Sequence, residues 1–254
     1  MYKRQTEDFK NDSFLNTLKT YDADLFVVVA FKFLPKEIWS IPKLGTINIH
    51  ASLLPNLRGA APINWALING LKETGLTSFF INEKIDYGNI ILQEKLKIQQ
   101  KDNFESLYKK LKDLSSKFIL KSIDCILDKD HNLKKQNSSK KYLIAPKLNR
   151  ENTRINWNKS AESIYNFVRG LSPVPCAWTL EKKTNKKILI YEVDFNTKSN
   201  DQKNGVKILN ELKTLSISTG KGSINIKSLK IEGKRVISGK DYLNANMKDQ
   251  IIFI

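Results

Sequence analysis

Two polar side chains lie two positions apart in an apolar stretch, and their types suit proton transfer and charge stabilisation. Asn48 and His50 alternate with Ile47 and Ile49, so in a strand they point to the same face. An imidazole changes charge near neutral pH, as a group that moves protons at that pH must. An isolated strand histidine is more often a structural residue held by hydrogen bonds. Its neighbours therefore decide between the two interpretations.

The residues after this pair leave the strand and begin a loop, Ser52-Leu-Leu-Pro55. This places Asn48 and His50 near the carboxyl end of the strand, the edge where ligands bind in open α/β sheets. Asp86, in a turn beside Gly88, is a further candidate, although Asp and Gly are also ordinary turn residues. We interpret the other histidine, His131, as a solvated residue without a catalytic role.

Several motifs, in this order, resemble the signature of enzymes that transfer a formyl group from 10-formyltetrahydrofolate. In the first half they are Asn48-Ile-His50-Ala-Ser52-Leu-Leu-Pro55, Arg58-Gly-Ala-Ala-Pro62-Ile and Asp86-Tyr-Gly88. The second of these resembles methionyl-tRNA formyltransferases in particular. The resemblance continues through Arg154-Ile-Asn-Trp157 and the segment from Gly170 to Trp178, where the C-terminal tRNA-binding domain of that family opens.

The resemblance implies catalytic roles for Asn48, His50 and Asp86. The methionyl amine would attack the formyl carbon, and the Asn48 amide and protonated His50 would stabilise the tetrahedral oxyanion. Asp86 would orient His50 and help to take a proton from the amine. No metal is expected, because no Cys/His cluster offers a site. The folate contacts of the family map onto Ser52, Leu53, Leu54 and Pro55.

The chain departs from the family pattern in three places. Tyr87 stands where a small residue is usual, so we expect a crowded turn or a different placement of Asp86. Asn56-Leu57 stands where a bulkier, more basic pair is frequent. Family members also have about 60 residues, or two βα units, before the equivalent of Phe14. The resemblance thus implies a front end missing from this chain and an apolar edge on the strand that starts at Asp24.

The hydrophobic pattern predicts strands and helices that alternate in the first half. The apolar run from Asp24 to Ala30 is typical of a strand buried on both faces of a parallel sheet. Other strands are predicted over 46–52, 76–83 and 89–98. Helices are predicted around 14–18, 35–39, 62–69 and 103–127, the last with Asp102 as N-cap. We therefore predict an α/β fold, a partial Rossmann-like formyltransferase domain without its first strands.

The composition changes after residue 130, where lysine, asparagine and serine become frequent. A short helix is predicted to start at Ser160 and to end before Pro173. Short strands with glycine turns follow, which predicts a small OB-like barrel. Those strands are expected over 177–181, 187–195, 205–209, 214–218, 223–226 and 229–231. We predict a catalytic domain over 1–130, an exposed basic linker over 131–152 and a tRNA-binding barrel over 153–254.

The whole chain has a net charge of +17, and its basic residues are concentrated in the second half. Residues 1–130 contain 19 Lys and Arg against 16 Asp and Glu, whereas the remainder contains 24 against 10. A strongly basic module beside a nearly neutral one favours polyanion binding by the basic one. This agrees with initiator methionyl-tRNA as the partner.

Cysteine usage and hydropathy argue against a metal-binding cysteine site and against a membrane protein. Cys125 and Cys176 have no metal-ligand spacing, and no stretch approaches the length of a membrane span. We expect a cytoplasmic protein with no membrane partner, and the plan of two modules predicts a monomer. Two alternatives remain. One is a formyltransferase for a small amine, such as an amino-sugar nucleotide or glycinamide ribonucleotide, and the other is an inactive RNA-binding fragment.

Overall fold

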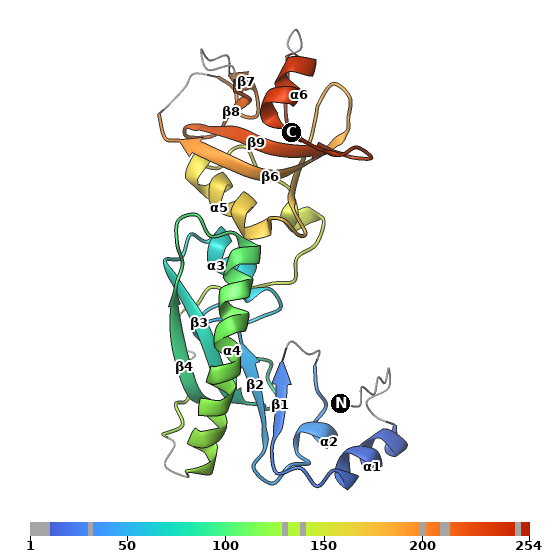
Figure 1. The fold of residues 1–254 in the computed structure, drawn as a ribbon, viewed down its shortest axis with the longest axis vertical. Coiled ribbons are helices and arrows are strands. Elements are labelled where there is room, and N and C mark those ends of the chain that lie inside the picture. Colours follow the sequence, from blue (N-terminus) through green and yellow to red (C-terminus); the bar gives the residue numbers. More distant parts are fainter. Residues whose placement is uncertain are drawn as a thin grey trace. The chain divides into compact units, whose positions relative to one another are not determined.

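The computed structural model describes residues 11–29, 33–128, 132–137, 141–198, 202–208, 214–246 and 250–254 of the 254-residue chain. The chain divides into two compact units (Figure 1). The first contains 1–62, 73–97 and 110–146, and the second contains 63–72, 98–109 and 147–254. His131, which we interpreted as a solvated residue, lies outside the described residues.

The first unit is built on a mixed four-stranded sheet. Its strands, in spatial order, are β1 (Phe26–Val29), β2 (Thr46–His50), β3 (Glu73–Phe80) and β4 (Ile90–Lys97). β1 and β2 are parallel, whereas β3 is antiparallel to both β2 and β4. The predicted α/β class is confirmed, but the expected parallel arrangement is limited to one pair of strands.

β1 forms an edge of this sheet within the described residues. Phe26 and Val28 are half-buried, while Val27 and Val29 are 39% and 55% exposed. The prediction of a strand buried on both faces is therefore wrong. An unbroken apolar run reports the types of the side chains, but it does not report whether a layer covers each face.

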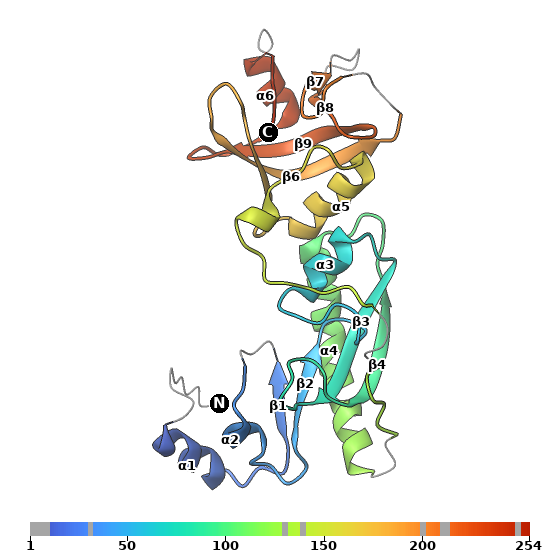
Figure 2. The ribbon, with the colours of Figure 1, turned by 180° about the vertical axis from the view of Figure 1, so that it is seen from behind.

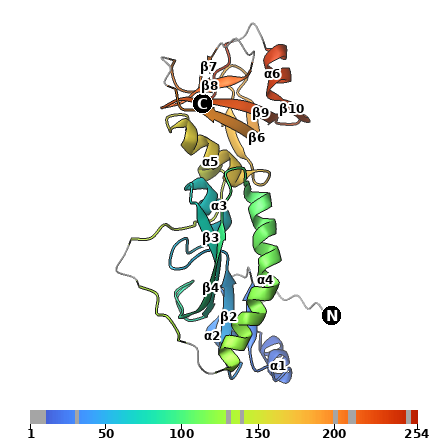
Figure 3. The same ribbon diagram turned by 60° about the vertical axis from the view of Figure 1, so that its left-hand side comes forward.

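Helices flank the sheet of the first unit. They are α1 (Asp12–Thr20), α2 (Lys36–Trp39) and the part of α4 (Phe104–Leu127) that starts at residue 110. Phe118 of α4 is fully buried, and the Ser122 hydroxyl donates to Ser78 Oγ of β3 at 2.9 Å. α4 and the described residues 132–137 and 141–146 lie on opposite sides of the sheet (Figure 3).

The cap of α4 lies one residue later than predicted. Asn103 Oδ1 accepts from the Ser106 backbone N–H at 2.9 Å, and the Asn103 N–H donates to Ser106 Oγ at 3.1 Å. These two bonds form a reciprocal capping box. Asp102 instead accepts from the Gln99 backbone N–H at 2.8 Å. Asp and Asn cap helices about equally well, so adjacent candidates are hard to separate by residue type.

The second unit is a curled antiparallel sheet packed against α5 (Ala161–Leu171), as Figures 1 and 2 show. Ser160 caps α5 as predicted, because its hydroxyl accepts from the Ser163 N–H. Ile164 and Val168 of α5 are buried in one core with the sheet residues Ile190 and Ile224. The remaining element of the first half, α3 (Pro62–Ile68), belongs mostly to this unit.

The strands of this sheet follow the order β5, β6, β9, β8, β7, with β10 paired to β9. Their bounds are β5 (Ala177–Leu180), β6 (Lys187–Asn196), β7 (Lys207–Ile208), β8 (Ser216–Ser218), β9 (Ser223–Ile231) and β10 (Val236–Ser238). β9 is one strand where two were predicted. β10 and the final helix, α6 (Gly239–Ala245), were not predicted. The prediction of a small barrel domain is otherwise confirmed, since these strands form a curled antiparallel sheet.

Candidate active site

β2 places Asn48 and His50 on one face, opposite Phe79 and Thr77 of β3. His50 is buried, with 6% of its surface exposed. Asn48 Oδ1 is also buried, and it has no hydrogen-bond partner among the described residues. Leaving a buried acceptor unpaired costs about 1–3 kcal/mol. Such an atom is suited to accept a hydrogen bond from an N–H or O–H of a bound molecule.

The two ring nitrogens of His50 face different partners. His50 Nε2 lies 2.9 Å from the Leu57 carbonyl oxygen. A carbonyl oxygen can only accept, so Nε2 carries a proton. Nδ1 faces Asp86 Oδ2 at 3.9 Å, which is too long for a hydrogen bond, and both side chains are at least 90% buried. Leu57, which sequence reasoning missed, therefore orients the ring more directly than Asp86 does.

Asp86 lies in a tight turn whose backbone approaches β3. Its φ of 59° is left-handed, and its Oδ2 accepts from the Gly59 N–H at 3.0 Å. A Cβ at Gly88 would lie 1.5 Å from the Phe80 carbonyl oxygen. Only glycine can hold the turn this close to the end of β3. The Asp-x-Gly spacing thus has a steric cause, and it brings Asp86 to His50.

Tyr87 does not crowd this turn. The side chain is 42% exposed, and the Arg58 guanidinium lies 3.5 Å from the centre of its ring. A cation over an aromatic face is a favourable contact. The unusual Tyr87 therefore adds a contact on the outside of the turn and leaves Asp86 beside His50.

Gln136 bonds to both loops that carry the motifs, and sequence reasoning missed it. Gln136 Nε2 donates to the carbonyl oxygens of Asp86 and Gly88, each at 2.9 Å. Gln136 Oε1 accepts from Arg58 Nε at 3.1 Å and from Arg58 Nη2 at 2.5 Å. Gln136 lies in the segment predicted to be a linker, where a single glutamine among Lys, Asn and Ser residues carries no recognisable signal.

Residues 141–146 run along the loop that follows the Ser52-Leu-Leu-Pro55 motif. The Leu57 N–H donates to Leu143 O at 2.7 Å, and the Ala145 N–H donates to Arg58 O at 2.7 Å. The Leu143 N–H donates to Asn56 Oδ1 at 3.0 Å. Most side chains of the predicted linker are exposed, as expected. Its backbone is nevertheless bonded to the loop, and the unusual Asn56-Leu57 pair supplies two of the bonds.

The Ser52-Leu-Leu-Pro55 loop is fastened to the sheet by two polar residues that sequence reasoning missed. Thr77 Oγ1 donates to Ser52 O at 2.6 Å and accepts from the Leu54 N–H at 3.1 Å. Gln93 Nε2 donates to Leu54 O at 2.9 Å. The Leu54 side chain is buried, whereas Leu53 and Pro55 are half-buried. The loop therefore has a fixed backbone and two partly accessible apolar side chains.

The described residues contain no group of three or more His, Cys, Asp and Glu side chains placed to hold a metal ion. Nor does any helix in the described part of the chain have the length and apolar character needed to span a membrane.

Comparison with known proteins gives a consistent result over both halves of the chain. Residues 2–123 match the family "Formyl transferase", and residues 147–247 match "Formyl transferase, C-terminal domain". Among solved structures, HypX from Aquifex aeolicus in complex with tetrahydrofolic acid has a TM-score of 0.64 at 19% identity, covering 90% of this chain and 40% of that one. WlaRD, a sugar 3N-formyl transferase, has a TM-score of 0.60 at 22% identity, covering 86% and 77%. These two likenesses concern the fold.

Relatives with higher sequence identity identify the family more specifically than the solved structures do. A methionyl-tRNA formyltransferase of Flavobacterium johnsoniae is 41% identical over 242 residues, which is 94% of this chain and 76% of the relative. One from Azobacteroides pseudotrichonymphae is 39% identical over 251 residues, 95% of this chain and 77% of the relative. At this identity and coverage, the chain belongs to the methionyl-tRNA formyltransferase family.

Proposed function

We propose that this protein transfers a formyl group from 10-formyltetrahydrofolate to the amino group of the methionyl moiety of initiator methionyl-tRNA, in translation initiation. The observation that carries the proposal is the buried cluster at the end of β2. There His50 faces Asp86, and Asn48 lies on the same strand face as His50. Family membership supports the reaction, and the basic second half supports the substrate.

In the proposed mechanism, the methionyl amine attacks the formyl carbon and the carbonyl oxygen becomes an oxyanion. Donors already in place lower the energy of that charge. The Asn48 amide supplies one donor. Since His50 Nε2 is bonded to Leu57 O, the imidazolium donates from Nδ1, on the side of Asp86. Asp86 accepts the proton that the amine loses. The oxyanion then re-forms the carbonyl as the carbon–nitrogen bond to the folate breaks, and the folate nitrogen takes up the proton passed on from Asp86 as tetrahydrofolate leaves.

The formyl donor is assigned to the loop of Ser52, Leu53, Leu54 and Pro55. Leu53 and Pro55 supply apolar side-chain surface, because both are half-buried. Ser52 and Leu54 contribute backbone, since the Ser52 hydroxyl donates to Asn56 O and the Leu54 side chain packs with Phe79. Thr77 and Gln93 keep this backbone in place for a flat ring system to lie against.

Residues 153–254 are proposed to bind the tRNA as a domain, with the basic linker 131–152 beside them. Arg150, Arg154 and Lys187 surround the Trp178 ring, with their charged groups 5.6, 5.3 and 5.1 Å from its centre. Cations clustered in this way attract a phosphate backbone, with an affinity that falls as salt rises. We also propose that the protein acts as a monomer in the cytoplasm, with residues 1–130 as its catalytic domain.

The test compares acceptors. The protein is mixed with 10-formyltetrahydrofolate and, separately, with aminoacylated initiator tRNA, an amino-sugar nucleotide and glycinamide ribonucleotide. We expect formyl transfer to the tRNA alone. Comparable kcat/KM for either small amine would overturn the substrate assignment. Binding of tRNA without any transfer or folate binding would favour the inactive RNA-binding alternative.

A further inference from the structure

We propose that Gln136 is a positioning residue of the reaction, which holds the Asp86 turn against the Arg58 loop from outside the catalytic motifs. This inference rests on the proposed function, because it assumes that Asp86 takes part in formyl transfer. The Gln136 side chain bonds to Arg58 and to the turn backbone, and it does so with both ends of its amide.

The Gln136 amide matches its surroundings in a way that other side chains cannot. Its two N–H bonds meet two carbonyl oxygens of the turn, and its oxygen meets two N–H groups of the guanidinium. A glutamate could accept from Arg58, but it has no donor for the carbonyls. Asparagine is one methylene shorter. The Asp86 carbonyl also accepts from Arg58 Nε at 3.1 Å, so the three residues form a closed set of bonds.

The backbone around Gln136 is fastened on both sides. Lys134 exchanges two backbone hydrogen bonds with Ile90 of β4, at 2.9 and 3.0 Å. Further along, Leu143 and Ala145 bond to the loop that carries Arg58. The residues on either side of Gln136 are therefore hydrogen-bonded to the sheet and to the motif loop, and this positions Gln136 at the turn.

This arrangement acts on the chemistry through the position of Asp86. The left-handed backbone of Asp86 aims its carboxylate at His50, and the Gln136 bonds hold the two carbonyls that define the turn. Misplacing a catalytic group by about 1 Å can cost on the order of 100-fold in rate. Among the described residues, the side-chain hydrogen bonds of Gln136 go to Arg58 and to the Asp86 turn and none goes to the predicted folate loop, so its loss should act on kcat rather than on substrate binding.

The experiment compares Gln136→Ala and Gln136→Glu with Leu133→Ala, an exposed residue of the same segment. Formyl transfer to initiator methionyl-tRNA is measured with saturation curves for both substrates. We expect both Gln136 variants to lose roughly 10- to 100-fold in kcat, with little change in either KM. Gln136→Glu should remain folded at the assay temperature, since its carboxylate still pairs with Arg58. Leu133→Ala should behave as the unchanged protein.

A normal kcat in Gln136→Glu would overturn the proposal, because the amide would then serve only to hold Arg58. A loss confined to KM would also overturn it. In an Asp86→Asn background, adding Gln136→Ala should lower kcat far less than it does alone, since the two residues act through one group. A full additional loss would contradict that. If the unchanged protein transfers no formyl group to the tRNA, the proposed function fails, and the role of Gln136 fails with it.

Discussion

The interiors of the two units are stabilised by different kinds of interaction. In the second unit, apolar residues from α5, the curled sheet and the C-terminal residues form one continuous core. In the first unit, the residues around His50 are held mainly by hydrogen bonds between side chains and loop backbone. Both side-chain atoms that are buried without a partner in the described structure, Asn48 Oδ1 and Thr74 Oγ1, belong to the first unit.

This difference shows where each unit is sensitive to change. An apolar core has no directional bonds, so it accepts many side chains of suitable volume. A network of hydrogen bonds fixes positions more sharply, and it loses that precision when one partner is removed. The first unit should therefore lose activity before it loses stability, and the second should show the reverse.

The largest effect is expected from Asp86→Asn. The asparagine oxygen can still accept from the Gly59 N–H, so the turn should be retained. The carboxylate that we propose accepts the amine proton is lost, which should lower kcat by roughly 10²- to 10⁴-fold. Steady-state formyl transfer measures the loss, and thermal unfolding checks the fold. A loss of less than tenfold would show that Asp86 has no part in proton transfer.

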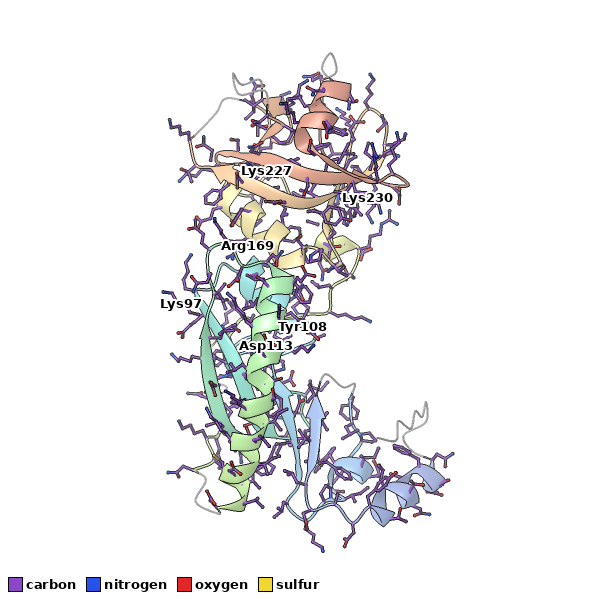
Figure 4. All side chains as sticks on the ribbon, viewed as in Figure 1. Lys97, Tyr108, Asp113, Arg169, Lys227 and Lys230 are labelled. Atoms are coloured by element: carbon purple, nitrogen blue, oxygen red, sulfur yellow. The ribbon has the colours of Figure 1, made fainter. Side chains whose placement is uncertain are left out.

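The second unit should respond more in stability, and Arg169→Met tests this. Arg169 is labelled in Figure 4, and burial of its guanidinium lowers its pKa. The guanidinium donates to Asp102 O at 3.0 Å and to Asn166 Oδ1 at 2.8 Å. Removing it leaves buried acceptors unpaired, at a cost of about 2–3 kcal/mol. Urea denaturation measures the change. The control is Lys227→Met, which loses an exposed pair with Asp194 and should cost about 0.5 kcal/mol or less.

A smaller and pH-dependent effect is expected from Glu181→Gln. Burial alone would raise the pKa of the Glu181 carboxyl, but hydrogen bonds from Thr184 and from the Lys183 N–H outweigh it and lower the pKa. A lowered pKa stabilises the fold above the unfolded value and loses that contribution as pH falls through the folded value. Near pH 7, the variant should be less stable by about 1–2 kcal/mol. The difference should vanish in acid, and a constant difference at every pH would contradict this account.

The two cysteines give the mildest comparison of the units. Burial raises the pKa of the Cys176 thiol to about 12, and its Sγ–H donates to Ile190 O. Cys125 on α4 is partly exposed. Only the thiolate reacts with alkylating agents, so at pH 8 Cys125 should be modified and Cys176 should be spared until the protein unfolds. Mass spectrometry after timed alkylation distinguishes them, and equal rates would contradict the burial of Cys176.

Local patterns could predict much of this molecule. The apolar spacing of α4 and the Ser160 cap of α5 were evident from side-chain types alone. The same patterns could not show that β1 is covered on one face only, because coverage depends on other elements. β9 reads as two strands because Lys227 and Ser228 interrupt its apolar run, yet both positions continue the extended backbone.

The residues of the candidate site could likewise be predicted only in part. Asn48 and His50 could be paired from their spacing, whereas Asp86 was one candidate from its turn beside Gly88 and was joined to the pair only through the resemblance. The contacts of Leu57 and Gln136 could not be predicted, because they depend on a backbone carbonyl and on a segment 50 residues beyond Asp86. Such tertiary hydrogen bonds leave no periodic signal in a single sequence.

We propose that Asn48 and His50 carry the formyl transfer while other parts of the chain bind the tRNA. The most direct test measures formyl transfer and tRNA affinity together in Asn48→Ala and His50→Ala. We expect a loss of roughly 10²- to 10³-fold in kcat for each variant, as for removal of an oxyanion donor, with the affinity for initiator tRNA unchanged. Near-normal turnover in both variants, or a parallel loss of tRNA binding, would contradict it.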